Sequence, residues 1–189
     1  MFCVFQFLRY SLGMRDSSDE QLMQQYATGD ALAFEEIYQR YRAPLFRYIQ
    51  RQVRDPAVAN DLYQGSWEKL IKARKQYRPT APFRAWLFRI AHNHMIDHFR
   101  ATRETEPLAD EFHVSTSPQP SDVLAVAQKE ASFRAALEQL PAEQKQTVLL
   151  KIEAGLNIEE IGKITGVEPE TVKSRLRYAV AKLKRTLQT

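Results

Sequence analysis

The residues with the clearest chemical spacing lie between Lys72 and Arg100, where positive charges alternate with aromatic rings. This stretch holds seven Lys or Arg residues and a single acid, Asp97. The interleaved rings are those of Tyr77, Phe83, Trp86, Phe88 and Phe99. Positive charge follows a phosphate backbone and aromatic faces stack on unpaired bases, so the composition favours single-stranded DNA. Tyr77 falls in an expected loop and is the better candidate for base contact, whereas Trp86 lies beside an apolar stripe that favours core packing.

Three histidines, His92, His94 and His98, occur in the same segment. His94 and His98 are four residues apart, a spacing that would allow both to bind one metal ion. No cysteine or third ligand accompanies them, and Met95 stands where zinc hydrolases place a glutamate. We therefore expect surface placement or a weak DNA contact, and no metal site. The chain also lacks a nucleophile paired with a base and a glycine-rich phosphate loop, so a binding protein without a cofactor is expected rather than an enzyme.

A second set of spaced residues, from Asn157 to Pro169, has the order of a helix-turn-helix. Asn157 and Glu160 have the N-cap and N3 spacing of a capping box. The helix that they open is short, and Gly166 can supply the left-handed residue that ends a helix tightly. Pro169 suits the first position of the next helix. A short capped helix, a glycine turn and a longer helix in this order predict a DNA-binding module.

The longer helix of this module is strongly basic. From Thr171 onward there are six basic residues and no acid. Its inner stripe is predicted to consist of Val172, Leu176, Ala179, Val180 and Leu183. Lys173, Ser174, Arg177 and Tyr178 then project outward near the N-terminal half, the part of a recognition helix that meets base edges in the major groove. The alternative is a solvated basic face, which is what a charge run alone usually means.

Helical periodicity in the rest of the sequence supplies the elements that hold these residues. Apolar residues recur at helical spacing from Asp19 to Arg100. Asp30 and Asp55-Pro56 have the residue types of helix starts, and Pro44 should kink a helix or mark a short break. Residues 77–82 are expected to form a loop and residues 83–100 a fourth helix. With no strand-like alternation and no repeat, the predicted fold class is all-α.

Composition divides the chain into two small helical domains joined by a flexible linker. Residues 19–100 form the first domain, residues 101–127 an acidic linker containing proline and serine, and residues 128–189 the second domain. The linker is expected to become helical from about Asp122. Residues 1–18 are expected to form a disordered or weakly packed extension. Its apolar stretch, residues 1–13, is too short to span a bilayer and lacks the basic start and the small-residue cleavage site of a signal peptide. Met1 and Met14 are both possible starts.

The distribution of charge points to polyanionic partners. The formal net charge is +4 and the pI about 9.2. Residues 19–100 carry +4 and residues 129–189 carry +3, whereas residues 101–128 carry −4. Two basic blocks separated by an acidic one suit two nucleic-acid contacts. Cys3 is the only cysteine, which excludes an intrachain disulfide and fits a reducing cytoplasm. The shortness of the apolar opening predicts no stable membrane insertion.

Taken together, these motifs resemble the extracytoplasmic-function (ECF) sigma factors, the minimal members of the sigma-70 family. Asp61-Leu62-Tyr63-Gln64 is similar to the family's Asp-x-x-Gln helix. The melting helix is matched by Trp86-Leu87, Ile90-Ala91, Asn93, Asp97 and Arg100. The −35-reading domain is matched by Leu140-Pro141, Glu159-Glu160-Ile161 and the segment from Thr171 to Leu176. The resemblance covers residues 19–187, and the order and spacing of the three motifs make it specific.

The resemblance implies a subunit that binds core RNA polymerase and directs promoter-specific transcription initiation. Asp61, Leu62 and Gln64 would dock on the coiled-coil clamp of the polymerase β′ subunit, and the β flap and an anti-sigma factor are further implied partners. The residues implied at the −10 element of promoter DNA are Lys75, Tyr77, Arg78, Arg89, Asn93, Asp97 and Arg100. The residues implied at the −35 element are Thr171, Lys173, Ser174, Arg175, Arg177 and Tyr178.

Four positions depart from the family pattern. Gly65 stands where an acid is usual, and Gly162 where alanine is usual. Glu168 replaces the usual serine or aspartate cap of the recognition helix, and glutamate is a poorer cap. Tyr178 stands where relatives often have arginine, so no particular −35 sequence is implied.

Alternative interpretations stay open at this point. A conventional helix-turn-helix regulator that binds DNA alone would explain residues 129–187, but it leaves the Asp61–Gln64 segment and the basic aromatic helix without a task. A sigma mimic that binds only an anti-sigma protein should lose its basic recognition face, which this chain keeps. The acidic linker either runs through a polymerase channel built for nucleic acid or serves only as a solubilising tether between the two domains.

Overall fold

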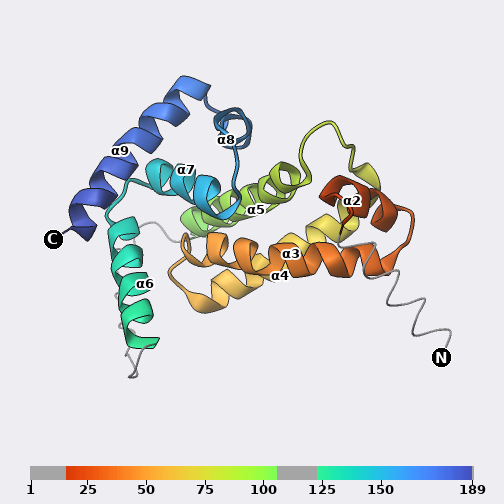
Figure 1. Cartoon of the computed structure of the whole chain (residues 1–189), viewed down its shortest axis with the longest axis horizontal. Helices are drawn as coiled ribbons and strands as arrows, with labels where there is room; N and C mark the ends of the chain where they lie inside the picture. Colours follow the sequence, from red (N-terminus) through yellow and green to blue (C-terminus); the bar gives the residue numbers. More distant parts are fainter. Residues whose placement is uncertain (1–15, 106–122, 189) are drawn as a thin grey trace.

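The computed structural model describes residues 16–105 and 123–188, and all secondary-structure elements assigned in these ranges are helices (Figure 1). The first range contains α2 (Asp19–Ala27), α3 (Ala31–Gln50), α4 (Pro56–Ala73), the 3-10 helix η1 (Arg74–Gln76) and α5 (Phe83–Thr105). The second contains α6 (Val123–Glu138), α7 (Ala142–Glu153), α8 (Ile158–Thr165) and α9 (Pro169–Leu187). The predicted all-α class is confirmed. No helix in the described ranges is long and apolar enough to cross a membrane.

Helices begin where side-chain acceptors satisfy their first N–H groups. The Asp30 carboxylate accepts hydrogen bonds from the second and third N–H groups of α3 at 3.0 and 3.4 Å. Asp55 caps α4 in the same way at 2.8 Å, with Pro56 at the first helical position. These two predicted helix starts are confirmed. In each, a short acceptor side chain supplies the hydrogen bond that the backbone N–H groups of the first turn cannot make within the helix. A capping box of Ser18 and Gln21 also opens α2.

Pro44 does not break the helix that Asp30 opens, contrary to one of the two outcomes expected from the sequence. Helix α3 is continuous with Pro44 inside it. Proline in a helix interior costs about 3 kcal/mol. Leu45, Tyr48 and Ile49 follow it and are fully buried. Burial of each such side chain contributes about 1.5–3 kcal/mol, so their packing together outweighs the loss of one helical hydrogen bond.

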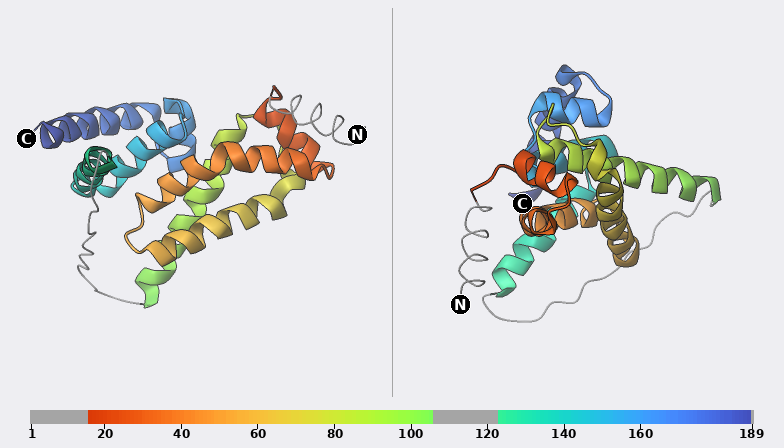
Figure 2. Two further views of the ribbon diagram at one scale, coloured as in Figure 1. Left: turned by 60° about the horizontal axis from the view of Figure 1, so that its bottom comes forward. Right: turned by 90° about the vertical axis from the view of Figure 1, so that its right-hand side faces the viewer.

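The N-terminal helices form a bundle in which α5 packs on α4 and α3, and α2 lies against α3 and α5 (Figures 1 and 2). Aromatic rings fill its centre. The Tyr48 and Phe88 rings meet edge to face at 5.3 Å between centroids, and the Phe34 and Trp67 rings at 5.9 Å. This packing fixes the position of α5, which carries the basic aromatic stretch.

The C-terminal helices form a second unit in which α9 packs against α6, α7 and α8. Leu137, Leu149, Leu156 and Ile161 are fully buried between them. The short α8 contributes one apolar face and begins and ends within eight residues. In Figure 1, α9 runs along one edge of this unit and α6 along another.

The two units contact each other, α7 against α3 and α8 against α5. The sequence predicted two domains and a linker, and it gave no indication of this contact. Helix α5 continues past the expected end at Arg100 to Thr105, into the segment expected to be linker. Helix α6 starts at Val123, which confirms the helical onset expected near Asp122. The middle of the expected linker, and residues 1–15 of the extension, lie outside the described residues.

Candidate nucleic-acid interface

The helix-turn-helix expected from the sequence is formed by α8 and α9. Asn157 Oδ1 accepts the Glu160 N–H, and Glu160 Oε2 accepts the Asn157 N–H, both at 2.8 Å, which confirms the capping box. Gly166 ends α8 with a φ of 70°, in the left-handed region that glycine adopts without strain. The Val167 N–H donates to the Gly162 carbonyl at 3.1 Å and closes the turn. Helix α9 then begins at Pro169.

Helix α9 carries its polar residues on an open face. Lys173, Arg177 and Tyr178 are exposed, and Thr171, Ser174 and Arg175 are half-buried. The Lys173 ammonium lies 3.1 Å from the Glu170 carboxylate, and the Arg177 guanidinium lies over the Tyr178 ring at 5.1 Å. Exposed ion pairs of this kind are worth about 1 kcal/mol or less. A phosphate or a base edge can therefore replace these contacts at small cost.

The inner stripe of α9 is narrower than predicted. Val172, Ala179 and Leu183 are buried, whereas Val180 is 44% exposed. Successive residues of an α-helix point about 100° apart, so Val180 cannot share the inward direction of Ala179. Including Val180 in the buried stripe was therefore wrong.

The exposed polar residues of α5 also share one face. Arg89, Asn93, Asp97 and Arg100 are all exposed. Spacings of three and four residues place them one above another along the helix. The structure therefore brings together four of the seven residues that the sequence suggested for a −10 contact. Lys75 and Arg78 are exposed in the segment before α5, where the Arg78 guanidinium donates to the carbonyl oxygens of Lys75 and Tyr77 at 3.0 and 2.9 Å.

Tyr77 does not project from the loop as the sequence suggested. Its side chain is 5% exposed, and its ring packs against Phe83 and Trp86 at centroid distances of 5.9 and 5.0 Å. Burial, together with the charges of Glu20 and Asp19, raises the pKa of Tyr77 to about 12. Trp86, expected to be the more buried ring, is only half-buried. The loop folds back because an aromatic cluster offers the Tyr77 ring more contact than solvent does.

The three histidines of α5 have different surroundings. His92 is 6% exposed, so surface placement was wrong for this residue. Its Nδ1 accepts a hydrogen bond from the Gln146 side chain of α7 at 2.9 Å, and the Tyr48 hydroxyl lies 3.5 Å away. Burial lowers the pKa of His92 below 6.5. His94 packs on α4, and across the described residues no group of three or more His, Cys, Asp or Glu side chains is placed to bind a metal.

Helix α4 presents only part of its predicted docking motif. Asp61 and Gln64 are exposed on the outer side of the helix. Leu62 is 3% exposed and belongs to the core. Leu62 therefore cannot contact a partner directly, which corrects its inclusion among the docking residues. Its role is to hold α4 against the bundle.

The polar face of α5 lies opposite the C-terminal unit. Trp86, Arg78 and Arg89 line a cleft of about 370 Å³ whose other wall includes Lys163 of α8. A second cleft of about 560 Å³ is bounded by Asn93, Asp97 and Arg100 on one side. Gln146 and the end of α8 bound its other side. In this arrangement duplex DNA cannot lie along the whole of the α5 face.

Ion pairs hold the two units together. The side chain of Glu153, the last residue of α7, is 5% exposed and pairs with Arg47 of α3 at 2.8 Å and with Arg51, the C-cap residue that follows α3. Arg51 is 9% exposed and also pairs with Glu130 of α6 at 2.9 Å. Arg54 and Glu138 form a more exposed pair at 3.2 Å. A buried carboxylate needs such partners, because an unpaired buried charge is strongly unfavourable.

Comparisons with known proteins assign both halves of the chain. The family model of Sigma-70 region 2 matches residues 37–105, and that of Sigma-70, region 4 matches residues 130–183. The sigma factor CarQ of Myxococcus xanthus is 30% identical over 171 residues, which cover 87% of this chain and 95% of CarQ. The ECF sigma factor SigL of Mycobacterium tuberculosis is 32% identical over 164 residues, which cover 86% of this chain and 93% of SigL.

The chain belongs to the ECF group of the sigma-70 family. It is an alternative sigma factor, a subunit that directs RNA polymerase in transcription initiation. The sigma factor RpoE from Bartonella quintana, solved in complex with the anti-sigma factor NepR, has the same fold. Its TM-score is 0.68 at 23% identity, over 82% of this chain and 97% of that chain.

Two departures from the sigma-factor pattern have structural reasons. A Cβ built on Gly162 would lie 2.7 Å from the Val167 carbonyl oxygen, so the turn of this sigma factor is too close for the usual alanine. A Cβ on Gly65 would lie 2.4 Å from Nε2 of His94. The ring of His94 therefore occupies the place where the usual acidic side chain of α4 would begin. As expected from its type, Glu168 makes no side-chain cap at α9.

Proposed function

We propose that this sigma factor reads two promoter elements with two helices, α9 at the −35 element and α5 at the −10 element, while bound to core RNA polymerase. The observation that carries the proposal is the open basic face of α9 behind a complete helix-turn-helix. Such a helix enters the major groove with its N-terminal half. Reading of the −35 element is assigned to residues 128–189 and reading of the −10 element to residues 19–100. The acidic segment 101–127 joins the two. We place this activity in the cytoplasm, where the polymerase acts.

At the −35 element, Lys173 and Arg177 are proposed to contact base edges. Thr171, Ser174, Arg175 and Tyr178 would then contact the backbone or flanking bases. Arg177 can bind the O6 and N7 atoms of guanine with two hydrogen bonds, a contact worth about 1–3 kcal/mol of discrimination. The helix presents these side chains without any rearrangement.

At the −10 element, α5 and the preceding segment are proposed to capture an extruded base of the non-template strand. Unstacking a base costs a few kcal/mol, which contacts to the base and to the backbone must offset. Arg89 and Arg100 supply charge for the backbone, and Asn93 and Asp97 supply polar groups for the base. Lys75 and Arg78 extend the basic surface. A stacking role for Tyr77 requires its ring to leave the aromatic cluster, whereas Trp86 is already half-exposed.

Polymerase docking is proposed for the exposed pair Asp61 and Gln64 on α4, against the coiled-coil clamp of the β′ subunit, with the C-terminal unit on the β flap. An anti-sigma factor is proposed as a further partner, the class of protein bound to RpoE in the solved complex. We propose no catalytic activity for the chain itself. The chemistry of RNA synthesis belongs to the core enzyme.

The contact between the two units explains why the free chain should bind promoters weakly. The polar face of α5 lies opposite α8, and both units must reach DNA elements at once. We therefore propose that the units separate on the polymerase. A stand-alone regulator would instead bind its DNA site tightly without the polymerase.

Run-off transcription with core enzyme on genomic fragments tests the proposal. We expect promoter-specific transcripts only when the chain and core enzyme are both present. Tight promoter-specific binding by the chain alone at physiological salt, or transcription that does not need the chain, would contradict it.

A second experiment tests the docking surface. Replacing Asp61 and Gln64 together by alanine should weaken binding to core polymerase while the helix-turn-helix stays folded. Glu68→Ala is the matched control, because Glu68 is exposed on the same helix outside the motif. Equal core affinity of the double variant and the control would exclude this docking site.

A further inference from the structure

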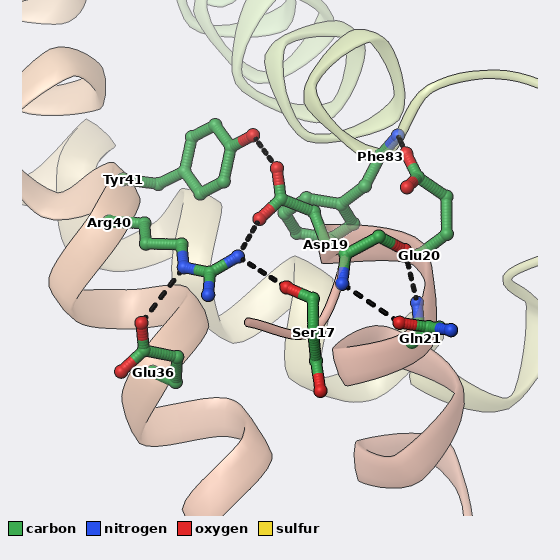
Figure 3. Close-up of polar contacts among 9 residues, drawn as sticks. Ser17, Asp19, Glu20, Gln21, Glu36, Arg40, Tyr41 and Phe83 are labelled. Atoms are coloured by element: carbon green, nitrogen blue, oxygen red, sulfur yellow. Dashed lines mark hydrogen bonds and ion pairs between the residues drawn. The ribbon is translucent and has the colours of Figure 1, made fainter. Parts of the chain in front are cut away.

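Helix α2 lies outside the segment matched by the region 2 family model, yet its first two acids contact two different helices. Figure 3 shows Asp19 and Glu20 pointing apart. Asp19 accepts hydrogen bonds from Arg40 at 2.8 Å and from the Tyr41 hydroxyl, which joins α2 to α3. Glu20 turns the other way, and its Oε1 accepts the N–H of Phe83 at 2.8 Å. Phe83 is the first residue of α5.

This contact supplies a cap that the local sequence cannot provide. The first N–H groups of a helix have no partner within the helix. The two residues before Phe83 are Ala81 and Pro82, neither of which has a side-chain acceptor. A carboxylate from 63 positions earlier takes that place. Negative charge at a helix N-terminus is also favoured by the helix dipole.

The Glu20 carboxyl stays ionised in this position. Partial burial acts to raise its pKa, but hydrogen bonds from the N–H groups of Phe83 and Glu20 itself and from Ser18, with the nearby charge of Arg84, lower the pKa below 4.5. The cap is therefore a charge-assisted hydrogen bond, which is stronger than one between neutral groups.

The capped residue is also the centre of the aromatic cluster that precedes the polar face of α5. The Phe83 ring is fully buried and lies 5.3 Å from the Tyr41 ring, 5.9 Å from the Tyr77 ring and 6.1 Å from the Trp86 ring. The backbone of Phe83 is held by α2, and its side chain is held by the cluster. If Tyr77 leaves the cluster when a base is captured, Phe83 loses one of its ring contacts, and the Glu20 contact continues to hold the first turn of α5.

We propose that Glu20 is a positioning residue for promoter opening, which fixes the N-terminus of α5 from the separate helix α2. The proposal rests on the proposed function of α5 at the −10 element. It separates opening from binding, because Glu20 lies on neither the α4 docking motif nor the α9 recognition face.

The test compares Glu20→Ala and Glu20→Gln with the wild-type chain, each with core enzyme on one promoter. Permanganate reactivity of unpaired thymines, normalised to footprint occupancy, measures opening per bound complex. This normalisation keeps a loss of folded protein from registering as a loss of opening. Loss of a charge-assisted bond at a partly exposed site should lower opening by Glu20→Ala about three- to tenfold. Glu20→Gln keeps an acceptor oxygen but loses the charge, so its opening should fall between those of Glu20→Ala and the wild type.

Glu35→Ala is the matched control, since it removes an exposed acid from the neighbouring helix α3 and should leave opening unchanged. Wild-type opening by Glu20→Ala would overturn the proposal. So would a glutamine variant as defective as the alanine variant, or a loss of core affinity that accounts for the whole defect. Failure of the wild-type chain to open any promoter would instead count against the proposed function itself.

Discussion

Helices α5 and α9 both carry a polar face suited to DNA, but only that of α9 is open. Lys173, Arg177 and Tyr178 project from α9 away from its buried stripe. On α5, the face that holds Asn93 and Asp97 looks across a cleft toward α7 and α8. The α9 face proposed for the −35 element is therefore open in the free chain. The side chains of the α5 face proposed for the −10 element are exposed, but the C-terminal unit lies opposite them.

The difference arises from which side of each helix its own unit uses. Helix α9 packs on α6, α7 and α8 through its buried stripe, and the opposite side of the helix meets solvent. The α5 face is free of its own bundle too, but the buried Glu153 carboxylate pairs with Arg47 of α3 and with Arg51 just after it. These ion pairs hold the C-terminal unit opposite the α5 face. A small number of charged residues between the units thus decides why the α5 face has the C-terminal unit opposite it and the α9 face is open. Each of these residues can be substituted.

Reversing the charge at the centre of the contact should have the largest effect. Glu153→Lys places a third positive charge beside Arg47 and Arg51, at a cost of about 3–5 kcal/mol to the closed arrangement. A positive charge at the C-terminus of α7 suits the helix dipole, so the unit itself should stay folded. Small-angle X-ray scattering should show a larger radius of gyration.

The matched control for this variant is Arg54→Ala. Arg54 pairs with Glu138 across the same contact, but its side chain is 63% exposed. Its loss should cost about 1 kcal/mol or less and leave the radius of gyration unchanged. If both variants scatter as the wild type does, buried charge does not hold the units together.

On the open side, Arg177→Ala should lose about 1–3 kcal/mol of discrimination at one −35 base pair. Competition binding of the holoenzyme to promoters varied one base pair at a time measures this loss. Lys184→Ala, exposed near the other end of α9, should weaken binding equally on all sequences. If Arg177→Ala lowered the affinity equally for all promoter variants, Arg177 would not be a residue that reads a base.

The buried ring beside α5 gives a smaller and more specific effect. Within the described part of the chain, the buried Tyr77 hydroxyl has no hydrogen-bond partner. Tyr77→Phe should therefore leave the free energy of unfolding unchanged or raise it by up to about 1 kcal/mol, as thermal melting would show. It should also retain promoter opening, because phenylalanine keeps the stacking face. A clear loss of stability would mean that the hydroxyl is engaged.

The smallest effect expected is a pH dependence of the contact at His92. Burial lowers the pKa of His92 in the closed form, so the open or unfolded form binds a proton more readily. Its contribution to stability is complete above the unfolded pKa of about 6.5 and is lost as the pH falls below that value. Scattering at about pH 5.5 should show a more open chain than at about pH 7.5.

His94 also has a pKa lowered by burial, and it contributes to unfolding in the same direction. His94 packs on α4 and not on the C-terminal unit. His92→Gln should therefore remove the pH dependence of scattering, and His94→Gln should retain it. An unchanged pH dependence in His92→Gln would contradict the assignment.

The sequence by itself determined the features that depend on neighbouring residues. Asp30, Asp55 and the Asn157–Glu160 pair start helices through bonds that span two or three residues, and Gly166 ends one through its own backbone freedom. The shared polar face of α5 followed from helical spacing. Short-range geometry of this kind is fixed once a segment becomes helical, so residue type and spacing are sufficient to predict it.

Only the tertiary structure decided how distant segments share residues. Arg51 and Glu153 are 102 positions apart, and Glu20 caps a helix 63 positions later. Tyr77 turns inward because Phe83 and Trp86 happen to meet it there, and Leu62 turns inward because α4 packs on its neighbours. From the sequence alone, an acid at a helix start or an arginine at a helix end could as well be exposed to solvent as paired with a distant residue. Its partner is chosen by packing, in which many small contacts between remote segments add up.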